Sequence, residues 1–174
     1  RYNVGTDFRN YETYFYYVKD GSQLEGIERG YWLLTKVSTL ISDDPVAFFF
    51  LSSLVVCGFV FVAIYQQSVN PPISIFLFFG TTMYFVSFNG IRQMMASAVL
   101  IYCLKYVEQR NLKKFAIGIV LATLFHSSAI LFAPVYLLEK IRINPKRIII
   151  FLILMTGAFP VLDDVIAFIS NLLG

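Results

Sequence analysis

The sequence predicts an all-α, polytopic integral membrane protein: a bundle of transmembrane helices with a re-entrant or kinked helical hairpin and an outer interfacial helix. Composition is the first reason, because only 14% of the 174 residues are charged and 57% are hydrophobic, whereas a soluble domain carries about 25% charged residues. Clustering is the second reason. No Asp, Glu, Lys or Arg occurs from Pro45 to Ile91, and about 20 consecutive apolar residues suffice to cross a bilayer.

The first 45 residues differ from the rest, because they mix charges with many tyrosines. We expect residues 1–45 to form an extracytoplasmic segment with an interfacial helix, since Trp and Tyr favour the membrane–water boundary. Its apolar residues recur at nearly helical spacing: Trp32, Leu33, Val37, Leu40 and Ile41.

Residues 46–174 are expected to form the transmembrane bundle. The apolar blocks predict spans at 46–65, 73–88, 94–107 and 148–162, together with the hairpin at 115–138. Pro71 and Pro72 end the first block but can start a helix. Asn89 and Gly90 interrupt the next block, which places Arg92 at a helix start.

Basic residues predict the topology of the bundle. The loop at 105–114 carries four cations against one acid, so the positive-inside rule makes it cytoplasmic and puts residues 1–45 and 89–93 on the outer face. The block at 115–138 has basic flanks on both sides. A hairpin turning at His126 reconciles these flanks, while a single span stays the alternative.

Arg92 is the most costly polar residue of the apolar region. A mid-membrane Arg costs about 2.5–3.5 kcal/mol, which marks it as a functional candidate, although a snorkelling anchor would also place Arg near the interface. On a helix, Asn89, Gln93 and Ala96 share its face and predict a pocket wall.

His126, followed by Ser127 and Ser128, is the second polar cluster. Proton transfer and simple hydrogen-bonded packing are both open for a lone His. Asp7 in "VGTD" and Glu28 in "ERGY" lie beside glycines, which allow a ligand to approach the backbone. One His and two scattered Cys predict no metal site.

In this order, "RYNVGTDFRNY", "EGIERGY", "FNGIRQMMA" and "LFHSSAI" resemble the EpsG family of bacterial exopolysaccharide and capsule polymerases, which are similar in role to Wzy-type polymerases. The resemblance covers residues 1 to about 138. Family members are longer, so the chain is expected to be an internal fragment of a longer membrane protein. Relatives also tend to have Pro where this chain has Arg29, which leaves the turn at Glu28 open.

The resemblance implies a membrane glycosyltransferase of the bacterial cytoplasmic membrane. It would transfer a glycan from undecaprenyl pyrophosphate onto a lipid-linked repeat unit at the outer face. The implied partners are the bilayer, that lipid-linked oligosaccharide, a flippase and a chain-length regulator. No cofactor, metal or nucleic acid is expected.

The resemblance also implies roles for individual residues. Arg92 would bind the departing pyrophosphate, because the planar guanidinium grips phosphate oxygens bidentately, and Arg1 would be a second cation. The remaining substrate-binding candidates are Asn89, Gln93 and Ser127. The base candidates are Asp7, Glu28 and His126, with Asp7 ranked first.

Three other functional hypotheses are also compatible with the sequence. An integral membrane acyltransferase would also use an intramembrane His. A transporter or flippase subunit would move the lipid-linked oligosaccharide without extending it. A purely structural membrane subunit would leave the cost of Arg92 unexplained.

Overall fold

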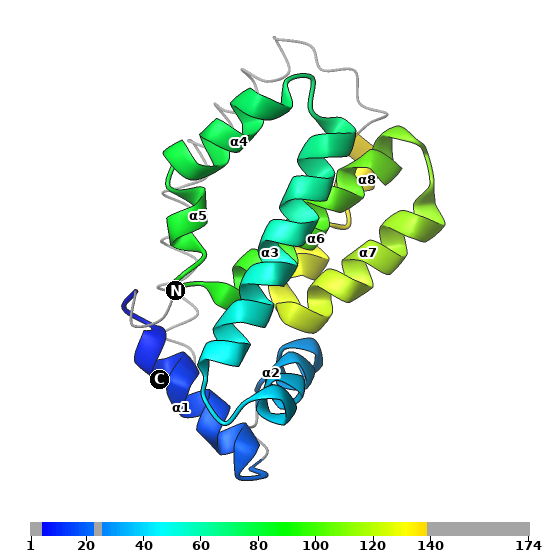
Figure 1. Ribbon diagram of the computed structural model, residues 1–174. Coiled ribbons are helices and arrows are strands. Elements are labelled where there is room, and N and C mark those ends of the chain that lie inside the picture. Colours follow the sequence, from blue (N-terminus) through cyan, green and yellow to red (C-terminus); the bar gives the residue numbers. More distant parts are fainter. Residues whose placement is uncertain (1–4, 23–25, 139–174) are drawn as a thin grey trace, which may run out of the picture. The chain divides into compact units, whose positions relative to one another are not determined.

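The computed structural model describes residues 5–22 and 26–138, and every regular element in them is helical (Figure 1). The chain divides into two compact units, residues 1–136 and 137–174. The described elements are α1 (Phe8–Lys19), α2 (Arg29–Ile41), α3 (Val46–Gln67), α4 (Pro71–Gly80), α5 (Met83–Val86), α6 (Ile91–Glu108), α7 (Leu112–Phe125) and the 3-10 helix η1 (Ser127–Phe132), followed by α8 (Val135–Leu138).

Helix α3 confirms the predicted helix at 46–65 and extends it by two residues. Within the described residues, α3 is the one helix that is both long and apolar enough to cross a membrane by itself, with a mean hydropathy of 2.6. It starts where Asp44 Oδ1 accepts a hydrogen bond from the Val46 N–H at 2.8 Å, which satisfies one of the free donors of a helix N-terminus.

The block at 73–88, predicted to form one span, is not one continuous helix. Helix α4 ends at Gly80 and α5 begins at Met83, because Thr82 adopts a left-handed conformation with φ of 64° and breaks the helix. The predicted start at Pro71 is confirmed. The Asn70 side chain also accepts a hydrogen bond from the Ile73 N–H at 3.3 Å, which caps this start.

Helix α6 is longer than the predicted span at 94–107, since it starts directly after Gly90. Arg92 therefore lies in its first turn, as predicted. The predicted break at His126 is also confirmed. Helix α7 ends at Phe125, His126 is extended with φ of −155°, and η1 follows. The predicted span at 148–162 and the basic flank at 139–147 lie outside the described residues.

Helix α6 is shared by two hydrophobic cores. One core joins α6 to α7 and η1, and Cys103, Val107, Phe115 and Ile119 are buried in it. The other core is mostly aromatic and joins α1 and α2 to α3, to α4 and to the first half of α6. Its fully or nearly fully buried aromatic side chains are Phe8, Tyr11, Phe15, Tyr31, Phe48, Phe49 and Phe78.

The first 45 residues contain two helices rather than the one predicted. The predicted helix is α2, but the face it turns to the protein carries Tyr31, Thr35 and Ser38. Its apolar stripe is exposed instead: Leu33, Val37, Leu40 and Ile41. Arg29 occupies the first position of α2, where Pro is also favoured. The departure from the family pattern at Arg29 is therefore compatible with the helix start that follows Glu28.

Gly30 lets the start of α2 approach the end of α7. A Cβ atom added at Gly30 would lie 2.7 Å from the Leu124 carbonyl oxygen and 2.9 Å from Leu124 Cβ. These distances are shorter than a van der Waals contact, and one partner is backbone that cannot rotate away. Gly30 thereby sets the spacing that brings Glu28 next to His126.

We predict that Gly30→Ala destabilises the protein by about 1–3 kcal/mol, the usual cost of overpacking a tight contact. The measurement is the thermal unfolding of the purified protein in detergent. Gly58→Ala in α3 is the matched control, because a Cβ there meets no atom within 4 Å and replacing a mid-helix Gly stabilises by about 0.5–1 kcal/mol. Equal effects of the two substitutions would contradict the tight α2–α7 contact.

Candidate functional site

The start of α1 is fastened to the start of α6 by hydrogen bonds. The Tyr11 hydroxyl donates to the Asn89 carbonyl oxygen and accepts from the Ile91 N–H at 3.0 Å. The Thr6 N–H donates to Asn89 Oδ1 at 2.9 Å. Gly5 fits this contact because its φ is +97° and a Cβ would lie 2.5 Å from the same oxygen. The "VGTD" and "FNG" motifs thus form one junction, in which the Asn89 side chain orients α1.

Glu28 is the centre of the charged cluster. It precedes the first residue of α2, and its side chain is only 12% exposed. One carboxylate oxygen, Oε2, accepts from Arg92 Nη1 at 2.8 Å. The other, Oε1, lies 3.1 Å from His126 Nδ1 and accepts from the Ser127 N–H at 3.2 Å. A single carboxylate therefore joins α2, α6 and the break between α7 and η1.

The surroundings of Glu28 favour its ionised form. Burial alone raises the pKa of the carboxyl, but hydrogen bonds from its own N–H, from the Ser127 N–H and from Arg92 outweigh burial and hold the pKa below its usual range. An ionised carboxylate only accepts hydrogen bonds, so His126 Nδ1 must carry the proton. The other ring nitrogen, Nε2, then has a free lone pair when the ring is neutral.

Arg92 is held from two directions. Besides the bond to Glu28, its guanidinium carbon lies 5.7 Å from the centre of the Tyr31 ring, within the range of a cation–π contact. Tyr31 is buried in the aromatic core, so its ring is a fixed support. Glu28 takes one of the five N–H donors of Arg92, and the described part of the chain offers no hydrogen-bond acceptor to the others.

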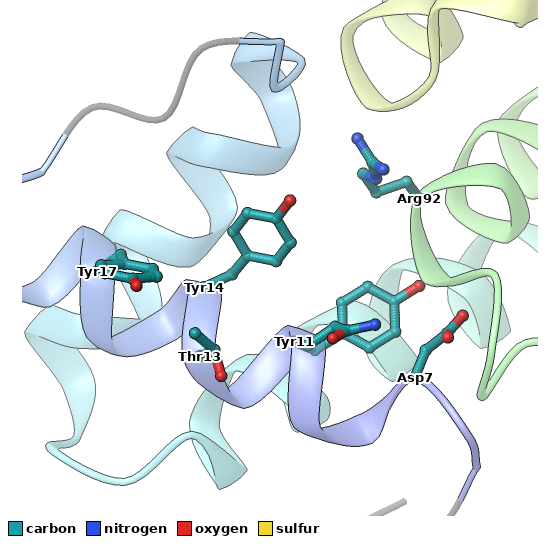
Figure 2. Close-up of a pocket in the computed structure, with 7 residues that line it drawn as sticks. Asp7, Tyr11, Thr13, Tyr14, Tyr17 and Arg92 are labelled. Atoms are coloured by element: carbon teal, nitrogen blue, oxygen red, sulfur yellow. The ribbon is translucent and has the colours of Figure 1, made fainter.

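Arg92 also lines a pocket of about 530 Å³, together with Asp7 and residues of α1 (Figure 2). The Asp7 carboxylate does not cap α1 and forms no hydrogen bond or ion pair with the described part of the chain. Among the described residues, this pocket therefore combines a cation that has further N–H donors with a carboxylate that has no partner. Glu28, in contrast, has both oxygens occupied.

A second hollow, of about 200 Å³, is lined by the next residue of α6. Gln93, Ala96 and His126 are among its lining residues. The predicted pocket wall is therefore divided, because Arg92 lines the first pocket and Gln93 lines the second. The first turn of α6 lies between them.

The structure brings most of the predicted site residues together. Glu28, Arg92, His126 and the Ser127 backbone form the cluster, Asp7 shares a pocket with Arg92, and Gln93 shares one with His126. Arg1 lies outside the described residues.

The tyrosines of the site were not predicted from the sequence. Tyr11 and Tyr31 support the site from the two N-terminal helices, and Tyr14 and Tyr17 line the larger pocket. One signal was present in the sequence, because Asn10, Tyr14 and Tyr17 recur with Thr13 at the spacing of one helix face. The pattern is hard to recognise because other tyrosines of the same segment lie on the remaining faces of the helix.

The described part of the chain is all-helical, contains one helix long and apolar enough to cross a membrane, and carries a partly buried Arg–Glu–His cluster at the start of α6. The sequence model of the EpsG family matches residues 1–174, so the chain belongs to the EpsG family. This family is associated with polysaccharide biosynthesis at bacterial membranes. Searches of curated proteins and of solved structures gave no significant match.

We predict a pH-dependent cost of Glu28→Gln. The folded-state pKa of Glu28 is lowered, so its ionisation stabilises the fold above the unfolded-state pKa, about 4.3, and this gain is lost as the pH falls through the folded-state pKa. At pH 7 the substitution should cost about 1–2 kcal/mol, and the difference from wild type should shrink below pH 4.

Thermal unfolding between pH 3.5 and 7.5 measures this difference. Glu108→Gln is the control, since Glu108 is exposed at the far end of α6 and surface charges contribute little. A cost of Glu28→Gln that stays constant over the whole pH range would show that the charge of Glu28 is not what stabilises the cluster.

Proposed function

We propose that this protein is a polysaccharide polymerase. It transfers a glycan from undecaprenyl pyrophosphate onto a lipid-linked repeat unit at the outer face of the cytoplasmic membrane. The observation that carries the proposal is the pocket that Arg92 shares with Asp7. Membership of the EpsG family supports the substrate class.

The reaction requires a base and a stabilised leaving group. The base removes the proton from a hydroxyl of the acceptor sugar, and that oxygen forms the new bond to the anomeric carbon of the donor. The bond from this carbon to the pyrophosphate oxygen breaks, and the lipid pyrophosphate leaves with the electron pair. Catalysis needs a fixed cation where this negative charge develops.

Arg92 suits the leaving group. Its guanidinium is held by Glu28 and by the Tyr31 ring, so little reorganisation is needed when a phosphate arrives. Its unused N–H donors can bind two phosphate oxygens at once. The N-terminus of α6 adds positive potential at the same place.

Asp7 suits the base better than Glu28 does. Glu28 is bound by Arg92, His126 and Ser127, and its lowered pKa makes it a poor proton acceptor. Asp7 lines the pocket, and its carboxylate has no partner among residues 5–22 and 26–138. In this assignment Glu28 positions Arg92 and His126, and His126 lines the neighbouring hollow as a substrate contact.

The proposed topology places this site at the outer membrane boundary. Helix α3 crosses the bilayer, the loop at 105–114 faces the cytoplasm, and the exposed apolar stripe of α2 lies in the outer interface. The stripe supports this placement, because Leu33, Val37 and Leu40 are exposed along one side of a helix whose other side packs on the protein. A lipid-anchored pyrophosphate would reach Arg92 from that interface.

We predict that Arg92→Lys abolishes polymer formation nearly as completely as Arg92→Ala. A lysine can pair with Glu28 as a point charge, but it lacks the planar fork that would grip phosphate at the same time. Polymer length on a gel, at matched protein abundance in the membrane, is the readout. Arg9→Lys, at an exposed position of α1, is the control. If Arg92→Lys makes polymer of normal length, Arg92 does not bind phosphate through a bidentate guanidinium.

A second prediction assigns the base. With purified protein and the lipid-linked repeat unit, Asp7→Asn should lower the extension rate by about 10²–10⁴, the usual loss on removing a general base. Donor binding should be retained, because the shape of the side chain is kept. His126→Gln should cost much less, since an amide can still donate to Glu28. An inactive His126→Gln beside a half-active Asp7→Asn would make His126 the base.

The His126–Glu28 pair favours one alternative function, an acyltransferase. A histidine whose Nδ1 is bound to a carboxylate keeps Nε2 available to take a proton from a hydroxyl. The two functions differ in their donors. Glycan modification that depends on added acyl-CoA, with polymer length unchanged, would select the acyltransferase.

A further inference from the structure

We propose that one face of α1 is a binding platform for the sugar rings of the glycan, running from the Asp7–Arg92 pair along the helix. This inference rests on the proposed function, because it names the part of the substrate that the same pocket receives. The residues that form the platform are Asn10, Thr13, Tyr14 and Tyr17.

The two faces of α1 have different compositions. Phe8, Tyr11, Phe15 and Val18 are buried and fix the helix to the protein. The four platform residues follow one another at helical spacing on the pocket side. An interface with another hydrophobic helix would require apolar side chains there, but this face presents two phenol rings, an amide and a hydroxyl.

The chemistry of this face matches a pyranose ring. The edge of a sugar carries hydroxyl groups, which pair with amide, hydroxyl and phenol groups that both donate and accept. The face of a sugar carries C–H bonds with a small positive charge, which favour the negative face of an aromatic ring. Ligand sites of this kind combine aromatic walls with a few polar groups.

The distribution of charge separates the parts of the substrate. In the described lining of the pocket, charge is confined to Asp7 and Arg92, while the α1 residues are neutral. A pyrophosphate therefore fits at the Arg92 end, and neutral sugars fit along α1. The pocket, of about 530 Å³, lies within the range of about 300–1,000 Å³ that small-ligand sites occupy.

The orientation of Tyr14 links the two ends. Figure 2 shows its side chain rising from α1 toward the side of the pocket where Arg92 lies. The Tyr14 ring also makes an edge-on contact with Tyr31, with ring centres 6.4 Å apart, which limits its movement. Tyr17, one turn further on, is 48% exposed and open to a ligand.

The test measures binding of a glycan that carries no lipid and no pyrophosphate. The probe is an oligosaccharide obtained by partial hydrolysis of the exopolysaccharide that the host strain makes. Its affinity for the full-length protein in lipid nanodiscs is measured by calorimetry. Tyr14→Ala and Tyr17→Ala should each weaken binding about three- to tenfold, as expected for the loss of one aromatic contact.

Tyr16→Ala is the matched control, because Tyr16 lies on the same helix and is 43% exposed but does not line the pocket. Its affinity should stay within roughly twofold of wild type. Tyr14→Phe keeps the ring and its packing against Tyr31, so it should bind better than Tyr14→Ala even if the latter is less stable.

The two proposals fail in different ways. Equal binding by wild type, Tyr17→Ala and Tyr16→Ala would overturn the platform, whether or not the protein polymerises. Tyrosine-dependent binding by a protein that never extends the lipid-linked unit would keep the platform and overturn the polymerase. In a working polymerase, Tyr17→Ala should raise KM for the repeat unit and leave kcat nearly unchanged.

Discussion

The Glu28 carboxylate is the contact on which the rest of the site depends. It binds Arg92 through one oxygen, and His126 and the Ser127 backbone through the other. Removing it would leave the partly buried Arg92 without the carboxylate that its guanidinium binds. The Glu28 carboxylate also explains the close contact at Gly30. The Glu28 side chain can reach Arg92 and His126 at the same time only because α2 approaches α7 closely.

The ion pair with Glu28 explains how the protein can place Arg92 in an apolar region, where it is proposed to bind pyrophosphate. An arginine in an apolar region is expensive, and Glu28 offsets much of that cost while the guanidinium is held against Tyr31. A preorganised cation is what a departing pyrophosphate requires. In the proposed mechanism the two acids therefore have different roles, since Glu28 already binds Arg92 and Asp7 has no partner among the described residues.

The sequence predicted those parts of the structure that depend on local pattern. Hydropathy predicted the helix over 46–65, and the two prolines at 71 and 72 indicated a helix start. The free-energy cost of an arginine and the basic flanks of the block at 115–138 directed attention to the first turn of α6 and to the break at His126. The break after Gly80 was not predicted, because an isolated glycine is often tolerated within a helix and neither Thr81 nor Thr82 is a typical helix breaker. The partners of Glu28 are 64, 98 and 99 residues away along the chain, and no local pattern encodes such distances. Its role as an ion-pair acceptor therefore needed the tertiary structure.

The most direct test of this account is the protonation of His126, the single histidine of this sequence. With ¹⁵N-labelled histidine, NMR spectra of the protein in nanodiscs report both ring nitrogens of this one residue. If Glu28 is an ionised acceptor that holds the site together, Nδ1 carries the proton when the ring is neutral and Nε2 carries none. A neutral ring protonated at Nε2, with a lone pair on Nδ1, would be incompatible with the contact to Glu28 and would contradict the central claim.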